Sequence, residues 1–156
     1  MGPESVVVTR TPVMLSRVAD SLYWMSRYLE RAKHTARVVD VHLDLMLDQP
    51  ESVAKQHREY LLAGFQLPTE FGSAKDDYEL TRWLTFEANN PNSIASCIAA
   101  ARQNARQLRE QISTEIWQQI NQLYHYMEQV EMDAMWSAEP REFYQNVKEG
   151  VHLFVG

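Results

Sequence analysis

"MLSRVADSLYWMSRYLERAKHTARVVDVHLDLMLD", residues 14–48, is the stretch that decides the fold. Apolar residues recur in it every seven positions in two interleaved series, which is the pattern of heptad a and d positions. The two series are Leu15, Leu22, Leu29, Ala36 and Leu43, and Val18, Met25, Ala32, Val39 and Met46. This repeat predicts one helix of about 33 residues, roughly 50 Å long at 1.5 Å per residue. The helix should end near Asp48, because Pro50 disfavours helix at the residue before it.

Helical periodicity continues along the rest of the chain, and we find no convincing strand pair. We expect further helices at about 50–66, at 77–88, from Ile94 onward and from Pro140 into the apolar C-terminal segment, with a loop over residues 67–77. The sequence therefore predicts an all-α fold, an antiparallel helical bundle with a long N-terminal helix.

Two local signals refine the second half of this bundle. The "NNPNS" segment, residues 89–93, is a break and a helix start, with Asn92 or Ser93 as the N-cap. Further on, the apolar spacing slips between Ile112 and Ile120. The helix there is either locally unwound or broken at Ser113-Thr114.

The two ends of the chain differ from the predicted helical domain, which we place at residues 14–156. The pattern of residues 1–13 matches nothing downstream, and we expect them to form a flexible N-terminal leader. The chain stops inside an apolar segment, "VHLFVG" at residues 151–156, with no polar closing turn. We expect that segment to be covered by a partner, by a second copy in a homodimer, or by a missing C-terminal half.

Composition excludes several classes of function. The formal net charge is −6 and the pI is near 5.3, whereas a general nucleic-acid binder needs a net basic surface. No apolar run reaches the roughly 20 residues that span a bilayer, so we expect no membrane insertion. The one cysteine, Cys97, cannot form an internal disulfide. These features favour a reducing, cytoplasmic location.

Arg31 is the unusual residue of the first helix. A helical wheel places it inside an apolar arc of about 160°, at 100° per residue. One interpretation is a partly buried guanidinium that binds a carboxylate or a phosphate through two hydrogen bonds. The other is a structural arginine, stacked on Trp24 or paired with an acid from another helix.

Other polar residues are weaker candidates. Glu30 lies on the opposite, solvated flank of the helix, where pairing with His34 would be worth only tenths of a kcal/mol. Arg102, Arg106 and Arg109, at positions i, i+4 and i+7, fall within a 60° arc beside an apolar stripe at about 100° per residue. They either bind an anion or pair with acids of the first helix.

Metal and thiol chemistry find little support. Di-iron bundles use Glu-x-x-His pairs on two helices, and no matching set occurs, so we predict no metal and no cofactor. Cys97 lies near an apolar stripe and is interpreted as a core residue, with no feature that would lower its pKa.

The two long blocks of the chain resemble a known family. Residues 14–41 are similar to the opening of the bacterial alpha-E domain family, which is named for its helices and a Glu-Arg motif. Residues 90–124 are similar to the family's second recurring block, which begins with Asn-Pro-Asn-Ser. The resemblance identifies Glu30-Arg31 as the motif. It adds Asn104 to the candidate ligand-binding set, and that set is Arg31, Arg102, Asn104, Arg106 and Arg109, followed along the chain by Glu115 and Trp117.

The resemblance also implies partners. Genes and fusions of that family accompany circularly permuted ATP-grasp proteins and transglutaminase-like proteins, which implies a role in making or modifying a peptide or amide bond. Its members usually continue into a C-terminal half with a second Glu-Arg helix. This chain is therefore similar to an N-terminal half, through truncation or a frameshifted gene.

Two functions follow from these patterns. The first is a helical interaction module that binds an ATP-grasp-type ligase or its peptide product and catalyses nothing itself. The second is an enzyme subunit in which Glu30 acts as a general base and the arginines hold an anionic substrate. The second needs Glu30 to be desolvated, whereas its position on the wheel places it in water. Both functions are therefore kept as alternatives.

Overall fold

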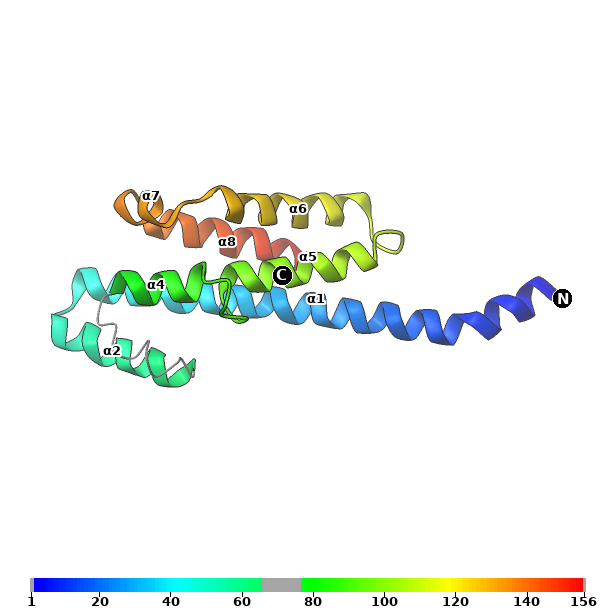
Figure 1. The fold of residues 1–156 in the computed structure, drawn as a ribbon, viewed down its shortest axis with the longest axis horizontal. Coiled ribbons are helices and arrows are strands. Elements are labelled where there is room, and N and C mark those ends of the chain that lie inside the picture. The colour runs from blue at the N-terminus through cyan, green and yellow to red at the C-terminus, as the bar shows by residue number, and fades with distance from the viewer. Residues whose placement is uncertain (1, 66–76, 156) are drawn as a thin grey trace.

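One long helix is the spine of the molecule. The computed structural model describes residues 2–65 and 77–155, with side chains placed for residues 15–65 and 77–152. The described residues form seven helices and no strand, so the predicted all-α bundle is confirmed. α1 (Gly2–Asp48) runs the length of the molecule, and α5 (Ile94–Gln107) and α8 (Pro140–Val155) run antiparallel to it (Figure 1).

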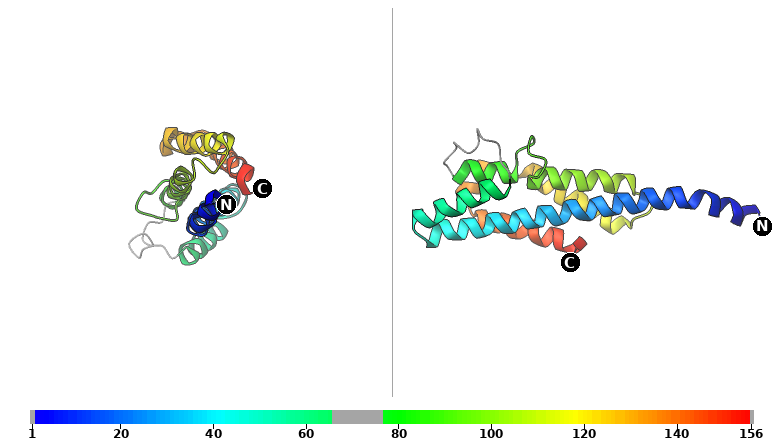
Figure 2. Two further views of the ribbon diagram at one scale, coloured as in Figure 1. Left: turned by 90° about the vertical axis from the view of Figure 1, so that its right-hand side faces the viewer. Right: turned by 90° about the horizontal axis from the view of Figure 1, so that it is seen from below.

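α1 begins earlier than the sequence indicated. Its backbone starts at Gly2 rather than near Met14, so residues 2–13, predicted as a leader, continue the helix. The flexibility of that leader stays a prediction. The N-terminal part of α1 extends beyond the other helices (Figure 2).

The heptad series on α1 is buried over only part of its length. From Met25 to Leu43 its members are at most 7% exposed, whereas Leu15 is 59% and Leu22 39% exposed. Two of the heptad positions that the repeat defines are therefore exposed. The reason is where the covering helices end: Gln107, the last residue of α5, lies 3.4 Å from Ser21, and His152 near the end of α8 lies 3.3 Å from Lys33.

Two serine caps define the helices of the second half. Ser93 caps α5 by accepting a hydrogen bond from the backbone N–H of Ser96 at 3.1 Å. Of the two N-cap candidates, Asn92 and Ser93, the cap is therefore Ser93. α5 ends at Gln107. Ser113 then caps α6 (Thr114–Gln129) by accepting from the N–H of Ile116, so the apolar phase slip marks a true break.

α6 forms an outer layer on α5 and α8 (Figure 1). It ends at Gln129, and a separate short helix, α7 (Met132–Ser137), follows. Val130 between them has an extended backbone, with ψ of 124°, which breaks the helical ladder. The last helix opens at Pro140, as predicted.

Two shorter helices lie along the C-terminal half of α1. α2 (Glu51–Gly64) runs back along α1, with Pro50 as its N-cap residue rather than in its first turn. α4 (Asp77–Thr85) is three residues shorter than the predicted 77–88. Of the expected loop, residues 67–76 lie outside the described part of the chain, as do the side chains of the apolar end after His152. No described helix is both long and apolar enough to span a membrane.

Two leucines at equivalent heptad positions of α1 provide a matched stability test. Leu29→Ala should lower the free energy of unfolding by about 2–5 kcal/mol, because it leaves a cavity around a side chain that is 0% exposed. Leu22→Ala should change it by no more than about 0.5 kcal/mol. Urea unfolding followed by circular dichroism measures both. Equal losses for the two variants would contradict the burial boundary on α1.

Candidate functional site

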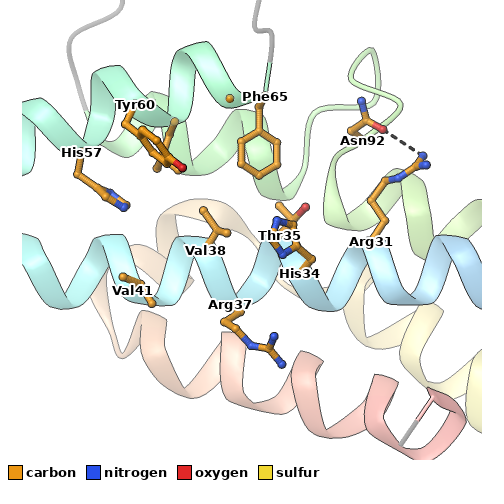
Figure 3. A pocket seen from close by; sticks show the side chains of 12 residues that line it. Arg31, His34, Thr35, Arg37, Val38, Val41, His57, Tyr60, Phe65 and Asn92 are labelled. Atoms are coloured by element: carbon orange, nitrogen blue, oxygen red, sulfur yellow. Dashed lines mark hydrogen bonds between the residues drawn. The ribbon is translucent and has the colours of Figure 1, made fainter.

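A pocket of about 720 Å³ lies between α1, α2 and the turn before α5 (Figure 3). Its size falls in the range of small-molecule sites. Its described lining consists of Arg31, His34, Thr35, Arg37, Val38, Val41, His57, Tyr60, Leu61, Gly64, Phe65 and Asn92. No carboxylate is among these residues, although the chain as a whole carries a net charge of −6. The pocket is therefore electrostatically suited to an anion.

Arg31 stands at one end of this pocket, half-buried. Its Nη1 donates to Oδ1 of Asn92 at 3.2 Å, and its guanidinium lies 5.7 Å from the ring centroid of Tyr28. The predicted partner Trp24 is not the residue it stacks on, and no described acid pairs with it. Four of its five N–H donors therefore remain for a ligand, on the count of described contacts.

The turn at residues 90–93 places Asn92 against Arg31. The side chain of Asn90 accepts from the backbone N–H of Asn92 at 3.0 Å and donates to the carbonyl of Trp83 at 3.1 Å. These bonds fix the turn between α4 and α5. The Glu-Arg pair of α1 and the Asn-Pro-Asn-Ser turn, far apart in sequence, thus meet in space.

Glu30 lies elsewhere. Its side chain is 53% exposed, and its Oε2 is 3.7 Å from Nη1 of Arg27, one turn earlier on α1. It does not line the pocket. A carboxylate that acts as a general base in this way needs a desolvated site, and the Glu30 side chain is more than half exposed. The structure therefore gives the Glu30 mechanism no support.

The arginines of α5 face a different partner from Arg31. Arg102 Nε donates to Asn121 Oδ1 at 2.6 Å, and its guanidinium lies 4.4 Å from the ring centroid of Tyr124 on α6. Arg109, in the turn after α5, lies 4.7 Å from Trp117. These are cation–π contacts between α5 and α6.

Two further predicted residues do not join Arg31 either. Asn104 donates to the carbonyl of Ala100 within α5, and Arg106 is exposed. The predicted set of ligand-binding residues is thus divided between two faces of the bundle, and only Arg31 lies in the pocket.

A buried polar network that the sequence did not reveal lies behind the other end of the pocket. Arg58 of α2 donates from Nε and Nη2 to the two carboxylate oxygens of Asp77 on α4, at 2.8 and 3.0 Å. His42 of α1 donates from Nε2 to the same carboxylate at 2.8 Å. Arg58 also reaches Glu51 at 3.1 Å. One carboxylate thereby links three helices.

The network continues to the pocket through His57. The Nδ1 atoms of His42 and His57 are 2.9 Å apart, and their rings are within 16° of parallel with centroids 5.0 Å apart, as an in-plane N–H···N bond requires. His42 is 1% exposed, whereas His57 lines the pocket. Asp77, His42 and His57 therefore form a continuous hydrogen-bonded chain from a buried carboxylate to the pocket.

This chain fixes which ring nitrogens carry protons. The Asp77 carboxylate can only accept, so His42 donates to it from Nε2, and we assign Nδ1 of His42 as the acceptor toward His57. His57 must then donate from Nδ1, and its Nε2 is left as an acceptor. Burial, followed by the proximity of His42, lowers the pKa of His57 from 6.5, which favours this neutral form.

The charges of Asp77 and Arg58, the buried pair of the network, are also defined. Burial alone would raise the pKa of Asp77, but the hydrogen bonds from Arg58 and then His42 outweigh it and hold this pKa below 3.8. The hydrogen bond to Asp77 is the main cause of the raised pKa of Arg58. The pair is therefore ionised at neutral pH.

Cys97 and the metal-binding residue types add no chemistry here. Cys97 is 0% exposed, and burial raises the pKa of its thiol to about 11, so it is the core residue that the sequence indicated. Within the described ranges, no cluster of three or more His, Cys, Asp or Glu side chains is arranged to hold a metal ion.

Comparison with known proteins now defines the class. Residues 14–156 match the Alpha-E family, described as a predicted alpha-helical domain with a conserved ER motif. The chain belongs to this family, and its one Glu-Arg dipeptide is Glu30-Arg31. No solved structure matches the chain.

The curated relatives are much longer proteins. An uncharacterised protein of Mycobacterium bovis is 29% identical over 117 residues, which cover 65% of this chain and 13% of that protein. An uncharacterised protein of Mycobacterium tuberculosis strain H37Rv is 28% identical over a stretch of the same extent. The chain thus spans about 13% of the length of the curated relatives it matches.

The lowered pKa of His57 has a measurable consequence for stability. Below pH 6.5 the unfolded chain binds this proton more readily than the folded chain, so the free energy of unfolding should fall as pH drops from 6.5 to the native pKa. His57→Gln should remove this part of the pH dependence. His34→Gln, on the same pocket but outside the network, should keep it. Urea unfolding at a series of pH values measures the slopes, and an unchanged slope in His57→Gln would contradict the assignment.

Proposed function

We propose that this chain is a helical interaction module that docks on an ATP-grasp-type peptide or amide ligase. One observation carries the proposal: large apolar side chains are exposed on several sides of the projecting part of α1. The residues and their exposed fractions are Leu15 (59%), Leu22 (39%), Tyr23 (56%) and Trp24 (44%). Tyr23 and Trp24 also pack edge to face, with ring centroids 5.3 Å apart, and exposed groups of large apolar side chains mark protein interfaces.

The nature of the partner rests on two supports. The resemblance to the alpha-E family implies an association with ATP-grasp proteins and with transglutaminase-like proteins. In addition, the matched segment is 13% of the curated relatives, so in those proteins the domain stands beside much additional chain. A domain that elsewhere is one part of a long protein is well suited to act as an accessory to another protein.

The alternative, an enzyme subunit with Glu30 as general base, has less support. Glu30 is exposed and paired with Arg27, and the arginines of α5 contact aromatic rings of α6. Neither arrangement forms a desolvated acid–base site. The interaction module needs no such site and is consistent with all of these contacts.

Docking is tested with charge substitutions on α1. Leu22→Asp and Trp24→Asp should each weaken the complex with the ATP-grasp protein by at least about tenfold, because a charge must be desolvated at the interface. Leu47→Asp is the matched control, since Leu47 is 75% exposed at the other end of the same helix. Size-exclusion chromatography with light scattering reports the complex, and titration calorimetry its affinity.

Two results would contradict the proposal. One is a complex whose affinity is unchanged by the α1 substitutions. The other is self-association of the chain alone that Leu22→Asp removes, because this would assign the exposed surface to a second copy of the chain.

A further inference from the structure

We propose that the pocket between α1 and α2 binds the carboxylate end of a short extended peptide. This is a ligand site distinct from the docking surface at the N-terminal part of α1, and it does not depend on the proposed partner. Three features of the pocket support this assignment: a cationic end, a neutral acceptor at the other end, and an apolar wall between them.

At the cationic end, Arg31 supplies the positive charge and Thr35 supplies a hydroxyl donor. They are four residues apart on α1 and hence neighbours on one face. The guanidinium has one described hydrogen bond, to Asn92, and no described carboxylate partner. Thr35 is 0% exposed, and its hydroxyl has no hydrogen-bond partner among the described residues. Figure 3 shows this hydroxyl on the side of α1 that faces Phe65 and the pocket.

These two groups are the donors that a carboxylate requires. A buried hydroxyl without a partner costs free energy, and a ligand oxygen would remove that cost. A half-buried guanidinium is the usual planar partner of a carboxylate, with two parallel N–H···O bonds. Arg37 does not join them, because its guanidinium points away from the pocket toward α8 (Figure 3).

The opposite end of the pocket accepts a hydrogen bond. His57 Nε2 is left unprotonated by the bond from His57 Nδ1 to His42, which in turn donates to Asp77. A neutral acceptor at the far end suits an amide N–H of the ligand. It disfavours a second carboxylate there, since His57 Nε2 has no proton to donate.

The distance between the two ends sets the length of the ligand. His57, at the far end, contacts His42, and Arg31 and His42 are eleven positions apart on α1, a helical rise of about 16 Å at 1.5 Å per residue. An extended acyl-tripeptide spans about 13 Å at 3.3 Å per unit. Between the ends the wall is formed by Val38, Val41, Tyr60 and Phe65, which suits small aliphatic side chains.

The test compares three probes on the full chain by NMR chemical-shift titration. N-acetyl-trialanine with a free carboxylate should bind saturably and about tenfold more tightly than its C-terminal amide, because the amide loses the charge-assisted bonds to Arg31. Octanoate has the carboxylate but no peptide N–H and should bind more weakly than the peptide. This comparison uses unmodified protein, so it stands even where a variant fails to fold.

Two matched variants locate the site. Arg31→Ala should abolish the preference for carboxylate over amide, whereas Arg37→Ala, on the same helix and at the same pocket, should retain it. His57→Phe should weaken binding of both peptides and leave octanoate unaffected.

Several outcomes would overturn the assignment. They are equal affinity for the carboxylate and the amide, no saturable shift of pocket residues, or an Arg31→Ala variant that keeps the preference. Octanoate binding as tightly as the peptide would assign the pocket to an acyl chain instead. Loss of peptide binding with an intact ligase complex, or the reverse, separates this inference from the proposed docking function.

Discussion

The carboxylate of Asp77 is the interaction on which the arrangement of the site depends. It accepts two hydrogen bonds from Arg58 and one from His42, and so connects α4 to α2 and to α1. Arg58 and His42 are both nearly fully buried, so loss of the carboxylate would leave two buried donors without an acceptor. Breaking a buried pair in this way costs about 3–5 kcal/mol, more than most single contacts. The position of α2, and with it the outer wall of the pocket, follows from this link.

The remainder of the fold depends on the buried series of α1. Residues from Met25 to Leu43 pack against α5 and α8, and the same helix presents Arg31, Thr35 and His42 on its α2 side. Each of these polar groups keeps its place because the apolar series beside it holds α1 in one rotation. Packing thus determines the geometry of the site, and the site itself is made of the few polar residues that packing leaves facing α2.

Much of this architecture is predictable from the sequence, because it depends on local periodicity. The heptad series predicted the long helix and Pro50 predicted its end. Ser93 was one of two N-cap candidates, and a break at Ser113 was one of two alternatives. The exposure of Leu15 and Leu22 was not predictable, because it depends on how far α5 and α8 reach along α1. Periodicity defines which face of a helix is apolar, but not how much of it a partner helix covers.

The candidate site was only partly predictable for a related reason. Arg31 stood out because it interrupts an apolar arc. In the sequence, His42 lies between Asp40 and Asp44 and is one of several polar residues there. Its partners His57 and Asp77 follow 15 and 35 residues later, on other helices. No spacing rule relates them, since the network exists only once three helices have packed. A buried histidine on the apolar side of a helix, next to Leu43, was the one available signal.

The most direct test of this account is the protonation of the two histidine rings at neutral pH, measured by long-range ¹H–¹⁵N NMR correlation. The expected result is a proton on Nε2 of His42, a proton on Nδ1 of His57, and no proton on Nε2 of His57. Asp77→Asn should change the His42 signals, because the acceptor that fixes them is lost. A proton on His57 Nε2 in the unmodified protein, whether in the other tautomer or in an imidazolium, would contradict the hydrogen-bonded chain that connects Asp77 to the pocket.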